Sequence, residues 1–166
     1  MITIGIDPGT AITGYGIINE EQDGRLVVLD YGVIRTSAEF HQADRLAQLY
    51  QKIKELILLH QPDMGAVEKL FFERNVRTAL QVGQARGVAL LAMAESKMQI
   101  GEYTPLEVKQ AVAGYGAADK NQVQQMVRTI LGLNTIPHPD DAADALAVAI
   151  CHIHSAKLRN LLDDRG

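Results

Sequence analysis

ITIGIDPGT occupies residues 2–10, and this short stretch decides how the rest of the chain is interpreted. Its apolar run stops at an Asp-Pro-Gly turn, which is typical of a buried strand and predicts one over residues 2–7. TGYGIIN (13–19) follows closely enough to form an antiparallel hairpin with it. RLVVLDYGVIR (25–35) comes after an Asp-Gly turn signal at 23–24 and predicts a third strand.

Beyond residue 40 the pattern alternates between helical and strand periodicity. Apolar residues at helical spacing predict an amphipathic helix over about 43–60. MGAVEK (64–69) predicts a short strand, about 76–98 a long helix, and QIGEYT (99–104) a further strand. Gly83 and Gly87 lie four apart in the long helix, where another backbone could approach closely.

Capping signals define the last part of the chain. Thr104-Pro105-Leu106-Glu107 is a capping box and predicts a helix over 105–113. Asp119 is expected to cap a helix running to about 131, and a final helix is expected over about 141–158. The order of elements predicts an α/β fold, a mixed five-stranded sheet whose first three strands are antiparallel, with helices on both faces. We expect one domain over 1–158 and a flexible tail over 159–166.

Length and composition exclude several classes. The chain has 166 residues, 47% of them hydrophobic and 22% charged, as in one ordinary globular domain. It has neither a run of about eighteen apolar residues nor the pattern of a signal peptide. Cys151 is the only cysteine, which agrees with a reducing compartment, so we expect a cytoplasmic protein.

The charge is unevenly distributed along the chain. The net charge is −4, which by itself argues weakly against a nucleic-acid partner. Residues 68–128, however, carry eight basic and six acidic side chains, a local balance of +2. A basic surface in the middle of the chain is therefore compatible with the acidic total.

Carboxylates at element ends are the candidate functional groups. Asp7 ends the first strand, where it either begins a turn or serves a site at the sheet edge. Glu68 lies near the end of a short apolar strand, and burying it without a partner is expensive, so it either ligates something or pairs with Lys69. Asp141 and Asp144 share one helix face. Helix capping explains Asp141 adequately but Asp144 poorly, because Asp144 lies beyond the first turn.

If these four carboxylates converge, they repel one another unless cations lie among them. Hard oxygen ligands select Mg²⁺ or Mn²⁺. Two such ions about 4 Å apart can activate water and stabilise a leaving oxygen in phosphodiester hydrolysis. In this hypothesis Asp7 bridges two Mg²⁺ ions, Glu68 holds one, and Asp141 and Asp144 hold the other or position the water.

Several motifs together resemble the bacterial Holliday junction resolvase family, the RuvC family. They occur in the family's order over nearly the whole chain: IGIDPG (4–9), VE (67–68), VKQAV (108–112), GYGAADK (114–120) and DAADALA (141–147). The resemblance implies a ribonuclease-H-like fold with Asp7, Glu68, Asp141 and Asp144 as metal-binding catalytic carboxylates. It also implies a Mg²⁺-dependent homodimer that nicks four-way DNA junctions symmetrically, with some preference for the sequence at the cut. Such an enzyme leaves 5′-phosphate ends in recombination and DNA repair and works with the RuvAB branch-migration complex.

Further residues are candidates for DNA binding. Lys109 and Lys120 match basic residues of the family near its active site; the alternative is that they are ordinary solvated lysines. Phe71 matches a family aromatic that stacks on an unpaired base. One of the two adjacent phenylalanines could instead belong to the core, and we expect this of Phe72. Arg74 and Arg77 suit phosphate contacts, but these two residues and Arg86 could equally contact a second subunit. His138 has no assigned role. His152, His154 and Cys151 are expected to be packing or surface residues.

Three rival functions are open at this stage. An actin-like or sugar-kinase-like nucleotide binder shares the first loop, but it normally needs two domains. A junction-binding module without activity would not need all four carboxylates. A ribonuclease H acting on RNA–DNA hybrids is the nearest enzymatic alternative. The helix over 76–98, with its small and arginine residues, is the expected interface of a two-fold dimer.

Overall fold

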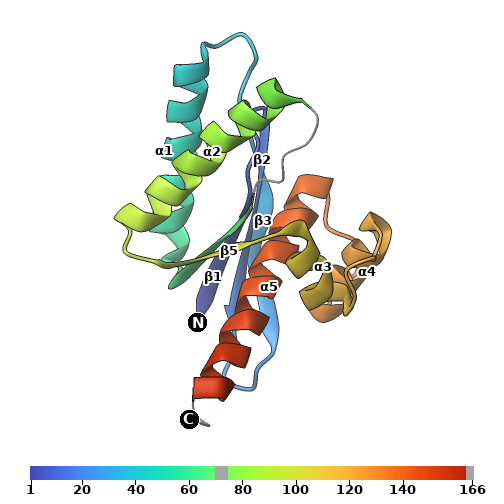
Figure 1. Ribbon diagram of the computed structural model, residues 1–166. Helices are drawn as coiled ribbons and strands as arrows, with labels where there is room; N and C mark the ends of the chain where they lie inside the picture. Colours follow the sequence, from blue (N-terminus) through green and yellow to red (C-terminus); the bar gives the residue numbers. More distant parts are fainter. Residues whose placement is uncertain (70–74, 164–166) are drawn as a thin grey trace.

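The computed structural model describes residues 1–69 and 75–163 and contains a five-stranded mixed sheet (Figure 1). The strand order is β3-β2-β1-β4-β5, with β1 antiparallel to β2, β2 antiparallel to β3, and β1, β4 and β5 parallel. The predicted sheet is thus confirmed. The strands are β1 (Ile2–Asp7), β2 (Ile12–Glu20), β3 (Leu26–Arg35), β4 (Met64–Glu68) and β5 (Gln99–Tyr103).

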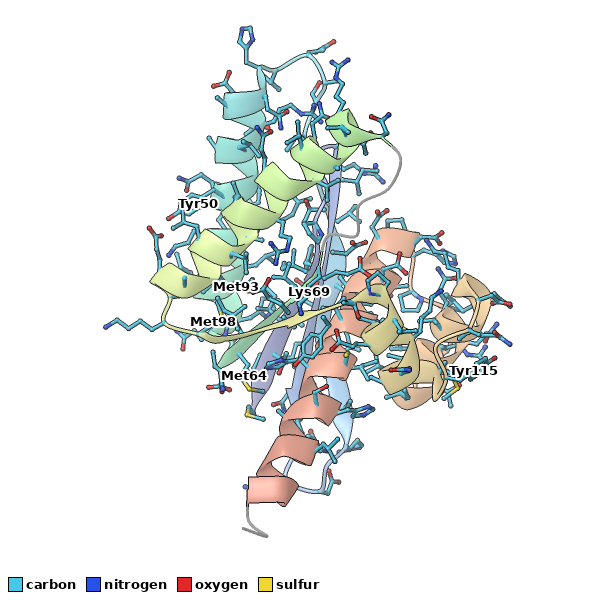
Figure 2. All side chains as sticks on the ribbon, in the orientation of Figure 1. Tyr50, Met64, Lys69, Met93, Met98 and Tyr115 are labelled. Carbon is cyan, nitrogen blue, oxygen red and sulfur yellow. The ribbon has the colours of Figure 1, made fainter. Side chains whose placement is uncertain are left out.

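Helices cover both faces of this sheet (Figure 1). On one face lie α1 (Gln42–His60) and α2 (Val76–Glu95), and Met93 and Met98 belong to the apolar cluster beneath them (Figure 2). On the other face lie α3 (Pro105–Ala113), α4 (Lys120–Ile130) and α5 (Asp140–Asp163). Alternate residues of β1 explain the two layers, because Ile4 and Ile6 face α1 and α2 while Gly5 faces α5.

The capping predictions are confirmed. Thr104 accepts a hydrogen bond from the Glu107 N–H, and the Glu107 carboxylate accepts one from the Thr104 N–H. Asp119 and Gln122 make the same reciprocal pair at the start of α4. Two boundaries differ from expectation, since α2 ends at Glu95 and α5 continues to Asp163. Among the described residues, no helix is long and apolar enough to cross a bilayer.

Close packing of α5 against the sheet depends on glycines in the strands. A Cβ on Gly14 would overlap the Asp141 carbonyl oxygen, and one on Gly5 would overlap the Ala145 carbonyl oxygen. Glycine is therefore required at both positions for α5 to lie directly on β1 and β2. Gly87 of α2, by contrast, has open space where its Cβ would be, so no other part of the described chain approaches it.

Candidate active site

Two of the four candidate carboxylates come from neighbouring parallel strands. Asp7 ends β1 and Glu68 ends β4, and the strands are in register with Ile6 opposite Val67. Because parallel strands end at the same edge of a sheet, the two carboxyl groups meet there, and they share a hydrogen bond. Asp7 and Glu68 therefore lie next to each other, as the sequence predicts.

The other two come from the start of α5. Asp7 lies opposite Gly14 in the β1–β2 ladder, and Gly14 in turn touches the backbone of Asp141. This contact brings the first turn of α5 to the end of β1. Asp144 lies one turn further along the same helix face, so all four acidic side chains gather at one end of the sheet.

Burial and like charge shape the protonation of this cluster. Burial, together with the negative charges of Glu68, Asp144 and Asp141, raises the pKa of Asp7 to about 8. Burial and the Asp144 charge raise the pKa of Glu68, while its hydrogen bond with Asp7 opposes the rise. Asp7 therefore holds a proton at neutral pH in the absence of added cations and donates it to Glu68.

One lysine partly neutralises the cluster. Lys120, at the first position of α4, places its Nζ 3.1 Å from Asp140 and 3.2 Å from Asp144. Burial nevertheless raises the pKa of Asp144, against the pull of Lys120. Asp140 also accepts a hydrogen bond of 3.1 Å from Gln124, so it links α4 to the start of α5.

The cluster suits a hard divalent cation in its donor chemistry. All of its donors are carboxylate oxygens, and Lys120 offsets only part of their negative charge. Over residues 1–69 and 75–163, no three Asp, Glu, His or Cys side chains already stand close enough together to hold one ion. In the present arrangement Asp7 shares a hydrogen bond with Glu68, and Asp144 pairs with Lys120.

Two hollows flank the carboxylates. One, of about 210 Å³, is lined by Glu68 and Asp144 together with Lys109 and Lys120. The other, of about 390 Å³, is lined by Asp7 and Glu68 together with residues of α2. Lys69 also lines it and lies at the centre of the view in Figure 2. No local sequence pattern predicts this second hollow, because its walls come from four separate segments.

The remaining candidates have different surroundings. Arg77 is exposed in the first turn of α2, and Phe71, Phe72 and Arg74 lie outside the described residues. His152 is buried and bonds Tyr103 at 2.9 Å, His154 lies 3.2 Å from the Ala111 carbonyl, and Cys151 is buried. These three side chains are packing residues, as expected. His138 is exposed in the turn before α5.

The model of the family described as "Crossover junction endodeoxyribonuclease RuvC" matches residues 3–152. The chain belongs to the RuvC family. A RuvC from Desulfitobacterium hafniense is 59% identical over 160 residues, covering 96% of each chain, and one from Roseiflexus is 56% identical over 162 residues, covering 98% of this chain and 96% of the relative. Both relatives are described as crossover junction endodeoxyribonucleases.

Solved structures agree with this assignment. Thermus thermophilus RuvC in complex with a Holliday junction substrate superposes with a TM-score of 0.90 at 37% identity, covering 95% of this chain and 96% of the other. The match confirms the ribonuclease-H-like fold of this RuvC-family chain. Members of the RuvC family are nucleases that depend on divalent metal ions, which agrees with the all-oxygen donor set described above.

Proposed function

We propose that this RuvC-family chain is an endonuclease that resolves Holliday junctions in recombination and DNA repair, with Asp7, Glu68, Asp141 and Asp144 as its catalytic carboxylates. The observation that carries the proposal is the gathering of these carboxylates, from β1, β4 and α5, at one end of the sheet. A buried acid such as Asp7, surrounded by three others, is a feature of functional sites rather than of stability.

These carboxylates are the groups that would hold two divalent ions, and Mg²⁺ is the ion we propose, with Mn²⁺ able to substitute. When bound, such ions lower the pKa of a water and offset charge on a leaving oxygen. Asp7 is central because the negative charges of both Glu68 and the α5 acids raise its pKa. To act as a ligand it must give up its proton, which the approach of a cation favours.

Two lysines would hold the DNA backbone beside the carboxylates. Lys109 and Lys120 line the smaller hollow with Glu68 and Asp144. The Lys120 ammonium now pairs with Asp144; with a cation held by Asp144, it would be free to contact a phosphate and to offset charge in the transition state. Arg77, exposed on α2, would add a further phosphate contact.

We also propose that the enzyme acts as a two-fold homodimer, with α2 at the interface. Exposed apolar residues on α2 recur at helical spacing as Val76, Leu80 and Leu91, with Gly87 between them. Exposing these apolar side chains to water is unfavourable, and α2 of a second copy of the chain would bury them. Two active sites related by a two-fold axis suit paired nicks on a symmetric junction.

A synthetic four-way junction tests the proposal directly. We expect symmetric nicks with 5′-phosphate ends when Mg²⁺ is present, and no nicks in EDTA. Asp7→Asn should abolish nicking while junction binding survives; cleavage by that variant at near wild-type rate would refute the assignment. RNA–DNA hybrid, offered in the same assay, separates this activity from that of a ribonuclease H.

Two broader parts of the proposal concern the cell. A junction resolvase needs junctions whose position can move, so we propose cooperation with the RuvAB branch-migration complex. Its DNA substrate also favours the cytoplasm as the compartment of action. Co-sedimentation of this chain with RuvAB on junction DNA tests the first point, and loss of the shared complex on removing the junction would identify DNA as the bridge.

A further inference from the structure

The larger hollow beside the carboxylates has no role in the proposed function so far. It measures about 390 Å³, within the range of small-molecule pockets, and Asp7 and Glu68 form one of its walls. The smaller hollow shares Glu68 and Pro105 with it. A DNA strand whose scissile phosphate lies over the carboxylates must continue past them, and the larger hollow lies beside them on the α2 side.

The walls of this hollow combine apolar surfaces with polar and charged groups, among them Lys69, Asn75 and Thr78. Pro8, Ala79, Val82 and Pro105 present apolar surfaces from three different parts of the fold. Apolar walls with a few polar donors are typical of pockets that bind planar, partly polar molecules. Nucleobases are such molecules, and every base offers two faces that pack against apolar side chains.

Arg86 is the donor that distinguishes this hollow. Its guanidinium pairs with Glu102 of β5, and its side chain is only 22% exposed. Among the described residues, its buried Nε has no hydrogen-bond partner. Because Glu102 neutralises its charge, Arg86 has little net attraction for a phosphate, yet it retains directional N–H donors. Because Arg86 lines the hollow, the guanidinium N–H groups that Glu102 does not use can donate to an acceptor on a ligand.

We propose that the larger hollow receives one base of the cleaved strand next to the scissile phosphate, and that Arg86 reads an acceptor atom on the edge of that base. Arg86 is then a specificity-determining residue, and Glu102 is the residue that positions it. The inference rests on the proposed function, since it requires that DNA be cut over Asp7 and Glu68. Arginine donors pair well with the O6 and N7 acceptors of guanine and with carbonyl acceptors of other bases.

An abasic scan tests whether a base enters the hollow. Junctions carry a single abasic nucleotide at successive positions around the cut, which removes the base but keeps the sugar and phosphate. We expect wild-type cleavage to fall about tenfold at one position adjacent to the cut. Ala79→Phe fills the hollow without removing a polar group, so its cleavage should be low and indifferent to the abasic site at that position.

A library of junctions with randomised cut sequences tests the reading by Arg86. Wild type should show a preference of about tenfold at the position found in the scan, and both Arg86→Ala and Arg86→Lys should flatten it. Lysine keeps the charge and the pairing with Glu102 but loses the planar fork of donors. Arg35→Ala, on the exposed edge strand β3, is the matched control and should keep the wild-type preference.

The outcomes separate the possible explanations. If Arg86→Lys keeps the wild-type preference, Arg86 serves only the ion pair with Glu102, and the proposal is wrong. It is also wrong if no abasic position distinguishes wild type from Ala79→Phe, a result that does not depend on whether Arg86→Ala folds. Failure of wild type to cut any junction would instead overturn the proposed function itself.

Discussion

Asp7→Asn should stabilise the metal-free protein while abolishing its activity. The pKa of Asp7 rises from 3.8 to about 8 on folding, because burial and neighbouring acids disfavour its ionised form. Between these two values the folded state binds more protons than the unfolded state. The free energy of unfolding therefore falls as the pH rises from about 4 to about 8. Stability from this group is fully present below pH 4 and is lost by about pH 8.

The magnitude follows from the size of the shift. About three pH units separate the ordinary pKa of 3.8 from pH 7, and each unit corresponds to about 1.4 kcal/mol. At pH 7 Asp7 is ionised in the unfolded chain but must take up a proton on folding, which lowers the free energy of unfolding by about 4 kcal/mol. Asparagine has nearly the same shape and carries no charge, so it removes this cost. Its amide must still find hydrogen-bond partners, which returns about 1 to 2 kcal/mol. The net gain is therefore about 2 to 3 kcal/mol, or roughly 4 to 12 °C in Tm.

Urea unfolding at fixed protein concentration measures this gain, with EDTA present and the pH varied from 4 to 8. The difference between Asp7→Asn and wild type should grow with pH across this window. Asp44→Asn, exposed in the first turn of α1, changes the net charge equally and is expected to show almost no pH-dependent difference. Mg²⁺ should stabilise wild type far more than Asp7→Asn, because only wild type offers the central carboxylate. A variant less stable than wild type at pH 8 in EDTA would refute the reasoning.

Three further predictions concern packing, charge and assembly. Gly14→Ala should destabilise the protein by about 1 to 3 kcal/mol in urea unfolding and slow cleavage, because its Cβ would push Asp141 away from Asp7; unchanged stability would contradict the close approach of α5. Lys120→Met should bind Mn²⁺ several-fold more tightly in a calorimetric titration, since no ammonium competes for Asp144, yet cleave more slowly; weaker Mn²⁺ binding would contradict this view. Leu80→Glu, at a side chain 66% exposed on α2, should yield monomers in sedimentation, whereas Leu158→Glu on α5 should leave the dimer intact; a Leu80→Glu dimer would exclude this interface.

Much of the fold is encoded in signals a few residues long. The run 2–7 forms a strand because it is apolar and a proline turn stops it, and 105–113 forms a helix because Thr104 and Glu107 cap it. Helical spacing by itself likewise puts Asp141 and Asp144 on one face. Each of these signals involves only a few consecutive residues, so it can be identified in the sequence without a structure. The end of α5 was harder to predict, since no Gly or Pro stops that helix before Asp163.

The arrangement between elements depends on packing that no local pattern reports. Asp7 and Asp141 are distant in the chain, and they meet because Gly14 leaves room for α5 against the sheet. The links from Lys120 to Asp144 and from Arg86 to Glu102 likewise join separate elements. The sequence alone determined which residue types were available and on which strands and helices they stand. Which charges face one another depends on the packing of the layers, because burial and distance set pKa values and ion pairs and arise only in the folded chain.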